Sequence, residues 1–287
     1  MLLLIAFTFL EISLTTIQGK PVDSRLELVE NDMLITNDQK QVYNQLKDGR
    51  VRRAAIKDKW LWPGGKVPYT FGKNLNDVGK RIAKQAMQHW MDRTCVKFIE
   101  RSNQKNYLEF TYDGGCKAQV GYRKEPKQLI SIGSSDQSSY SPCTLGSTIH
   151  ELGHSIGFFH EHTRPDRDKF VRVIESNVRK EAAFDFEKVS TAFLDSRGND
   201  YDYGSIMHYS RYQGNNAYGA VTLEPLVPNT DIGQRIALSQ GDIDQTNKMY
   251  QCDAQGESHF TYNGDKDEDK TIDYGNIKGP KPGDILD

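Results

Sequence analysis

Three histidines and a glutamate lie within one short stretch of this 287-residue chain. His150 and His154 are four residues apart, so on a helix both imidazoles project from nearly the same face and can bind one metal ion. Glu151 is turned away from direct ligation, yet it is close enough to exchange a proton with a water molecule at the metal. The pattern predicts a hydrolytic zinc site of the peptidase type, with Glu151 as general base.

His160 is the third candidate ligand. It lies six residues beyond His154, and since a helix turns by about 100° per residue, a continuing helix would carry His160 to the opposite side. The helix must therefore end first, and Gly157 can adopt the left-handed conformation that ends it. Three neutral histidines leave one position open, as in catalytic rather than structural zinc sites. Because the chain has only seven histidines, three unrelated ones at this spacing are a poor alternative.

A second segment, residues 205–209, contains Met207, and metzincin peptidases have a methionine-containing turn after their three histidines. Together with residues 150–168, this segment resembles the astacin family of zinc metalloendopeptidases. The resemblance covers residues 54–252, because residues 54–56 are similar to a mature astacin start and the segments around Cys95 and Cys252 are similar to its flanking cysteine segments. It implies an enzyme that binds one catalytic zinc ion and hydrolyses internal bonds of protein or peptide substrates.

The resemblance also implies roles for further residues. Tyr209 would bind zinc in the resting enzyme and later donate a hydrogen bond to the negatively charged intermediate, which a phenol can do. An ordinary core or surface tyrosine is the alternative. Met207 is expected to form the apolar floor of the site, because a thioether is a weak zinc ligand beside three imidazoles. Glu161 would pair with the new ammonium group of Ala54 after processing.

The first 53 residues are expected to be removed from the enzyme. Residues 2–10 are apolar but too short to span a bilayer, which predicts a signal peptide over residues 1–19 and a secreted, extracellular protein. No basic residue precedes the apolar run, so an uncleaved anchor is the alternative. Residues 20–53 are polar and end in an arginine-rich stretch, which predicts a propeptide cut by a trypsin-like or furin-like protease, or else a basic linker.

Within this segment, Asp32 is the candidate for a zymogen switch. Residues 29–32 resemble the Phe-x-Gly-Asp segment of astacin zymogens, which implies that Asp32 binds zinc in the zymogen only. The chain departs from that pattern at Val29 and Asn31. Asparagine tolerates left-handed backbone conformations better than most residues, so the second departure is the milder one.

The four cysteines are expected to form disulfides in an oxidising compartment, and the sequence alone permits three pairings. The resemblance implies Cys95 with Cys252 and Cys116 with Cys143. The balance of 37 basic and 39 acidic residues argues against nucleic acid as a partner, and no stable membrane association is expected. Residues 253–287 have almost no apolar periodicity, which predicts a flexible polar tail.

The elements that must position these residues indicate an α+β fold. Helices are predicted over residues 77–94 and 239–250, the second opening on a Ser-x-x-Asp cap, and strands over residues 107–112 and 129–132. Residues 119–132 form either an edge strand that accepts an extended peptide or an ordinary paired strand. The resemblance implies two lobes, with a twisted sheet and the zinc helix in the N-terminal lobe and an irregular C-terminal lobe.

Two functions of other classes remain as alternatives. A secreted binding or toxin-like module could keep zinc for structure alone, but such a site has no need of Glu151 beside an open metal position. A metallo-hydrolase that acts on a bond other than a peptide bond gains nothing from the propeptide or from the edge strand.

Overall fold

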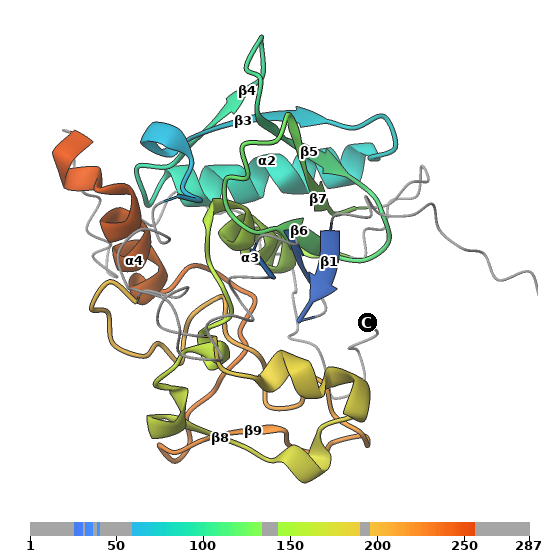
Figure 1. The fold of residues 1–287 in the computed structure, drawn as a ribbon, viewed down its shortest axis with the longest axis vertical. Helices are drawn as coiled ribbons and strands as arrows, with labels where there is room; N and C mark the ends of the chain where they lie inside the picture. The colour runs from blue at the N-terminus through green and yellow to red at the C-terminus, as the bar shows by residue number, and fades with distance from the viewer. Residues whose placement is uncertain are drawn as a thin grey trace, which may run out of the picture.

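The computed structural model describes residues 26–30, 32–36, 39–40, 59–133, 143–189 and 196–255. These residues form an upper lobe, in which two long helices lie beneath a sheet, and a lower lobe of short helices, loops and a small second sheet (Figure 1). This arrangement confirms the predicted α+β class and the two lobes. The predicted signal peptide, the new terminus at Ala54 and nearly all of the predicted tail lie outside the described residues.

The upper sheet has seven strands in the order β1-β2-β6-β7-β5-β3-β4. The strands are β1 (Leu26–Val29), β2 (Met33–Thr36), β3 (Lys66–Phe71), β4 (Lys97–Glu100), β5 (Tyr107–Thr111), β6 (Lys117–Gln119) and β7 (Lys127–Ser131). Strands β4, β3, β5 and β7 are parallel to one another, and β6 is antiparallel to β7. Strands β5 and β7 confirm the two predicted strands, with bounds shifted by one or two residues.

The sheet edge at β6 is covered by the N-terminal hairpin. Strands β1 and β2 pair antiparallel, and β2 runs parallel to β6, with Met33 opposite Ala118 and Leu34 opposite Gln119 (Figure 1). The edge-strand expectation for residues 119–132 is wrong for β7, because β7 is hydrogen-bonded on both sides, by β5 and β6. Of residues 119–132, Gln119 and Val120 lie on the edge at β6, since Gln119 is opposite Leu34 and Val120 N donates to Leu34 O at 3.3 Å.

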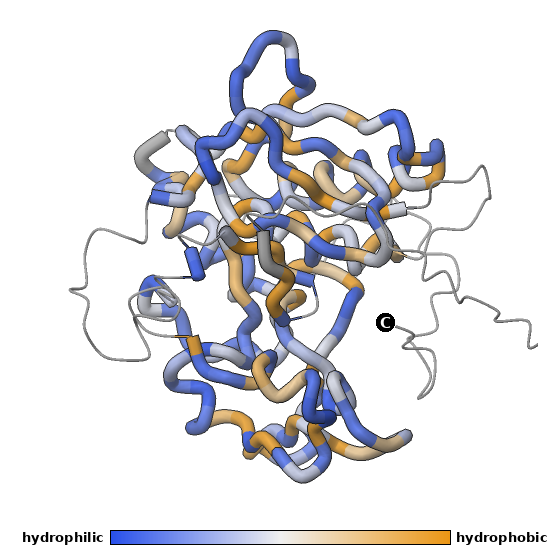
Figure 2. The backbone as a smooth tube through the Cα atoms, turned by 45° about the vertical axis from the view of Figure 1, so that its right-hand side comes forward, coloured by the Kyte–Doolittle hydropathy of each residue, from blue (hydrophilic) through white to orange (hydrophobic). Residues whose placement is uncertain are grey.

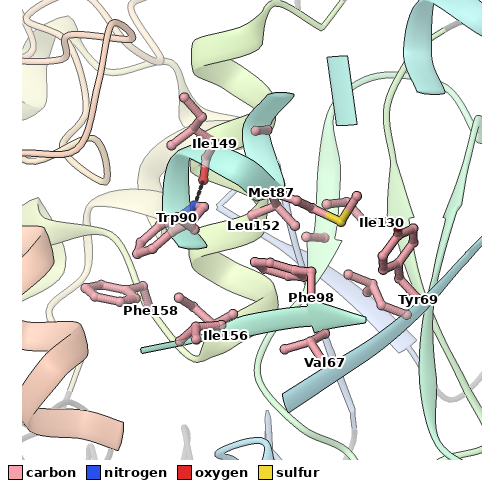
Figure 3. Close-up of a cluster of buried hydrophobic side chains, with 14 of the residues drawn as sticks. Val67, Tyr69, Met87, Trp90, Phe98, Ile130, Ile149, Leu152, Ile156 and Phe158 are labelled. Atoms are coloured by element: carbon pink, nitrogen blue, oxygen red, sulfur yellow. Dashed lines mark hydrogen bonds between the residues drawn. The ribbon is translucent and has the colours of Figure 1, made fainter. Parts of the chain in front are cut away.

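Two helices support the sheet. Helix α2 (Asp77–Met91) begins at Asn76, whose side chain caps Gly79 N, and it confirms the first predicted helix, ending three residues earlier than predicted. Helix α3 (Leu145–Ile156) carries the first two histidines. Trp90 of α2 donates its indole N–H to the carbonyl of Ile149 in α3 at 3.0 Å, so a hydrogen bond fixes the register of the two helices (Figure 3).

The main hydrophobic core lies between the sheet and these two helices. Figure 2 shows hydrophobic stretches through the middle of the upper lobe and a hydrophilic loop at its top. The strands, α2, α3 and the segment after α3 all contribute side chains that are at most 8% exposed; the residues labelled in Figure 3 are Val67, Tyr69, Met87, Trp90, Phe98, Ile130, Ile149, Leu152, Ile156 and Phe158. This core fixes the position of α3 and therefore of the histidines.

The lower lobe has little regular structure. Its strands β8 (Val171–Val173) and β9 (Leu223–Pro225) form an antiparallel pair. Helix α4 (Gln240–Tyr250) lies higher, level with α3 in Figure 1, and contributes Ile243, Met249 and Tyr250 to the main core. It begins at the predicted cap, where Ser239 and Asp242 form a capping box. The short 3₁₀ helices among the described residues are η1 (Pro63–Gly65), η2 (Glu161–Thr163), η3 (Arg167–Lys169), η4 (Glu175–Asn177), η5 (Lys180–Phe186) and η6 (Cys252–Gln255).

Two disulfides tie these elements together. Cys95, between α2 and β4, is bonded to Cys252 after α4, with 5.5 Å between their Cα atoms. Cys116, just before β6, is bonded to Cys143, which precedes α3. Within the described ranges, no helix has both the length and the apolar character needed to cross a bilayer.

Candidate active site and metal centre

The end of α3 brings the three histidines together. Gly157 has φ of 117°, and its N–H bonds back to the carbonyls of Gly153 and His154, so the helix ends there as the sequence predicted. His160 follows in extended conformation, with φ of −67° and ψ of 139°. The chain thus folds back and presents the third imidazole to the first two.

The Nε2 atoms of the three histidines converge on one point. His150 Nε2 lies 3.1 Å from His154 Nε2 and 3.3 Å from His160 Nε2. Asp32, from the turn between β1 and β2, completes the cluster, with its Oδ2 3.3 Å from His150 Nε2 and 3.2 Å from His160 Nε2. All four ligand atoms lie within 4.8 Å of one another, and each histidine is at most 2% exposed.

The hydrogen-bond partners of the Nδ1 atoms, which face away from the cluster, determine the tautomer of each histidine. His150 Nδ1 donates to the carbonyl of Ile206 at 2.8 Å, and His154 Nδ1 donates to that of Phe158 at 2.9 Å. His160 Nδ1 lies 2.6 Å from Oε2 of Glu30. With the proton on Nδ1, each Nε2 keeps its lone pair for a metal ion.

The cluster fits a tetrahedral zinc ion, for which three imidazole nitrogens and one carboxylate oxygen are suitable donors. A further observation supports the fit, because Asp32 Oδ1 is buried and has no hydrogen-bond partner among the described residues. Zinc would be held by His150, His154 and His160, with Asp32 in the fourth position.

The charges of the cluster favour one cation. Although burial opposes it, the charge of His160 and the close contacts of Asp32 with His150 and His160 hold the pKa of Asp32 well below its usual value. Burial lowers the pKa of His160, but Asp32 and Glu30 outweigh it and raise this pKa to about 9. Two carboxylates thus hold a positive charge among the histidines, and a bound metal cation would take the place of that proton.

Glu151 lies on α3 beside this cluster. Its side chain is buried, and its Oε2 has no hydrogen-bond partner in the described part of the chain. Burial first, and then the charge of Asp32, raise the pKa of Glu151 well above its usual value. Such a carboxylate can accept a proton and hold it without another protein group competing for it.

Met207 packs against Gly153 of α3. A Cβ atom on Gly153 would come within 2.6 Å of Met207 Sδ, so the absence of a side chain there allows the close approach. Asp242 fixes the turn before Met207, because its carboxylate accepts from Ser205 Oγ at 2.6 Å and from Ile206 N at 2.9 Å. The sequence marked Asp242 only as part of a helix cap, and nothing local indicated this second role.

Tyr209 lies beside the cluster, with its ring centroid 4.5 Å from that of His160, and its role as a zinc ligand in the resting enzyme stays a prediction. Its hydroxyl donates to the backbone carbonyl of Glu30 at 2.8 Å, and its ring stacks on that of His162 with centroids 3.9 Å apart. No sequence pattern predicts a role for Glu30 or His162. Glu30 lies next to two residues that depart from the zymogen pattern, and His162 follows the third histidine, but no spacing rule marks either of them.

Glu161 has partners within the described chain. Its Oε1 accepts from Arg164 Nη1 at 3.0 Å and from Asp202 N at 2.9 Å. Burial raises the pKa of Glu161 to about 8 despite the charge of Arg164. The expected partner Ala54 is outside the described residues, so its pairing with Glu161 stays a prediction.

The comparison with protein families decides the identity of this site. The family model described as Astacin, a family of peptidases, matches residues 54–251, which include all three histidines, Glu151, Met207 and Tyr209. The chain belongs to the astacin family. As an astacin it is a zinc metalloendopeptidase, and its one zinc ion fits the cluster described above. This assignment argues against the binding-module and non-peptide alternatives.

Individual relatives agree with the family assignment. The chain is 55% identical over 274 residues to "Nematocyst expressed protein 6" of Nematostella vectensis, and the match covers 93% of each protein. It is 42% identical to human "Tolloid-like protein 1" over 78% of this chain but only 22% of that protein, so it spans about a fifth of that relative's length. Among solved structures, a zinc-protease hatching enzyme from the medaka Oryzias latipes has a TM-score of 0.62 and 31% identity, covering 70% of this chain and 100% of the other.

Proposed function

We propose that this astacin is secreted as a zymogen, and that its processed form, which starts at Ala54, cleaves internal peptide bonds with Glu151 as general base. One observation carries the proposal. Asp32, from the N-terminal hairpin, lies against all three histidines and occupies the position that a catalytic zinc ion must keep open for water and substrate. Removal of the hairpin would free that position.

Glu151 and Tyr209 would carry out the proton transfer and the charge stabilisation. When bound, the zinc ion supplies Lewis-acid polarisation of the scissile carbonyl and lowers the pKa of the attacking water. Glu151 takes the proton from that water on its unpaired Oε2 and returns it to the leaving amine. Tyr209 loses the carbonyl of Glu30 as its acceptor when the hairpin leaves, so its hydroxyl is free to donate to the oxyanion.

The substrate would be an extended segment of a protein or peptide that pairs with β6. In the unprocessed chain the hairpin uses this edge, since Ala118 N donates to Asp32 O at 2.8 Å and Val120 N donates to Leu34 O at 3.3 Å. Removal of the hairpin would expose the same backbone groups to a substrate strand.

The proposed processing follows the predicted boundaries. Residues 1–19 would be the signal peptide, 20–53 the propeptide, 54–252 the catalytic domain and 253–287 a flexible tail. A trypsin-like or furin-like protease would cut at the arginines of residues 50–53. Both disulfides support passage through an oxidising compartment, as expected of a secreted protein. The relative from Nematostella vectensis, which is described as expressed in nematocysts, matches 93% of this chain and so more than the catalytic domain.

The test is cleavage of a denatured protein substrate by the chain that starts at Ala54 and by the unprocessed chain, each with and without a zinc chelator. We expect chelator-sensitive cleavage by the processed chain alone. The processed Glu151→Gln variant should bind zinc but should not cleave the substrate. Equal activity of the unprocessed chain would refute the zymogen, and retained activity of the variant would refute the role of Glu151.

A further inference from the structure

The three histidines differ in what holds their outer nitrogens. His150 and His154 donate to backbone carbonyls of the catalytic domain itself, at Ile206 and Phe158. The partner of His160 Nδ1 is the Glu30 carboxylate, which belongs to the N-terminal hairpin. Two ligands therefore keep their orientation after processing, whereas the third loses its partner.

The contact between Glu30 and His160 is fully buried. Both side chains are 0% exposed, and Oε2 and Nδ1 are 2.6 Å apart. Two further groups are held by the backbone oxygen of Glu30, because Tyr209 Oη donates to it at 2.8 Å and Asp32 N donates to it at 2.9 Å. One hairpin residue thus orients a zinc ligand, the tyrosine and the blocking aspartate.

The backbone of Glu30 is held in a costly conformation. Its φ of 51° lies in the left-handed region, which costs a residue with a side chain about 1–2 kcal/mol. The turn that contains this left-handed residue brings the Glu30 side chain to His160 and Asp32 to the metal cluster. The contacts of the hairpin must offset the cost.

We propose that Glu30 is a positioning residue for the zinc ligand His160, so that the propeptide strengthens the same zinc site that it blocks. This inference rests on the proposed zymogen. A carboxylate that accepts the Nδ1–H of a zinc-bound histidine fixes the ring and makes its Nε2 a stronger donor. Processing removes the carboxylate, and His160 becomes the ligand most loosely held.

The test compares zinc release from unprocessed chains. All chains carry Glu151→Gln, so that none can cleave itself, and are loaded with one zinc ion. The rate of zinc transfer to a chromophoric chelator such as pyridylazoresorcinol is measured for the parent, Glu30→Gln and Glu30→Ala. We expect transfer to be about 10-fold faster in Glu30→Ala, with Glu30→Gln in between because its amide oxygen is a neutral acceptor.

Gln39→Ala is the matched control. Gln39 also belongs to the N-terminal segment and binds the catalytic domain, donating to Val120 O at 3.1 Å and accepting from Arg123 Nη1 at 2.9 Å, and these bonds are to residues outside the metal cluster. Its loss should weaken docking of the segment and leave zinc release near the parent rate. An equal acceleration in Gln39→Ala, or parent-like release from both Glu30 variants, would overturn the role of Glu30.

This inference and the proposed zymogen can fail separately. Latency is measured in chains with Glu151 intact, as peptide cleavage before and after processing. If the unprocessed chain cleaves as fast as the processed one, the zymogen proposal fails. If the chain is latent but the Glu30 variants release zinc at the parent rate, the proposal for Glu30 fails and the zymogen stands.

Discussion

His89 should make the stability of this protein depend on pH. The residue lies on α2, is 3% exposed, and its Nε2 accepts at 3.1 Å the backbone N–H of Leu238, which precedes α4. Burial first, and then the charge of Arg93, lower the pKa of His89 to about 4, whereas Asp92 opposes the shift. A protonated ring could not accept this hydrogen bond, so the folded chain binds the proton more weakly than the unfolded chain does.

The sign and size of the effect follow from these values. Between the unfolded pKa of 6.5 and the folded pKa of about 4, the unfolded state binds more protons. The contribution of His89 is therefore fully present above pH 6.5 and is lost as the pH falls toward 4. For a single site with these pKa values, lowering the pH from 8 to 5 removes about 2 kcal/mol, and the full loss is about 3 kcal/mol.

The assay is urea unfolding of the unprocessed chain at pH 8 and at pH 5, compared with the His89→Gln variant. Glutamine offers an amide oxygen to Leu238 N but does not titrate. The free energy of unfolding should fall between pH 8 and pH 5 in both proteins. We expect this fall to be about 2 kcal/mol smaller in the variant than in the parent. Other titrating groups cancel in this difference. Parallel pH profiles would show that His89 does not have the inferred pKa.

Three further predictions concern the site. In Asp32→Asn, the unprocessed chain should cleave a peptide at least about 10-fold faster than the parent, because a neutral amide is a poor partner for a zinc ion and three histidines; unchanged latency would contradict this. In the processed chain, Tyr209→Phe should lower kcat about 100-fold with little change in KM, as expected for a donor to the oxyanion; a normal kcat would remove Tyr209 from the mechanism. Gly153→Ala should lower the free energy of unfolding by about 2 kcal/mol in urea titrations, since its Cβ would press on Met207 Sδ at 2.6 Å; an unchanged midpoint would show that Met207 moves without cost.

Local patterns were enough to predict much of the site. The spacing of His150 and His154 needs only a helix, and the need to turn back before His160 assigns Gly157 its left-handed conformation, which has φ of 117°. The cap at Ser239 was likewise visible, because a capping box is a pattern within four residues. Each of these features depends on neighbours in the sequence.

Features that depend on contacts across the chain were not predictable. The run Met33–Thr36 is too short to be recognised as a strand, and its pairing with β6 joins residues more than 80 positions apart. The contact of Glu30 with His160 joins residues 130 positions apart. No periodicity encodes such pairs, because they depend on how the folded lobes place the hairpin.

The disulfide between Cys95 and Cys252 limits the damage when one molecule of the enzyme cleaves another. It closes a covalent ring of the chain that contains α3, the histidines and nearly all of the lower lobe, with 157 positions between its two ends. A single cut at an exposed loop of this ring would open the chain but release no fragment. The nicked protein would migrate as one band without reductant and as two with it, because the bond between Cys95 and Cys252 would still join the two pieces. The ring thus gives the enzyme a tolerance of self-digestion that its loops alone would lack.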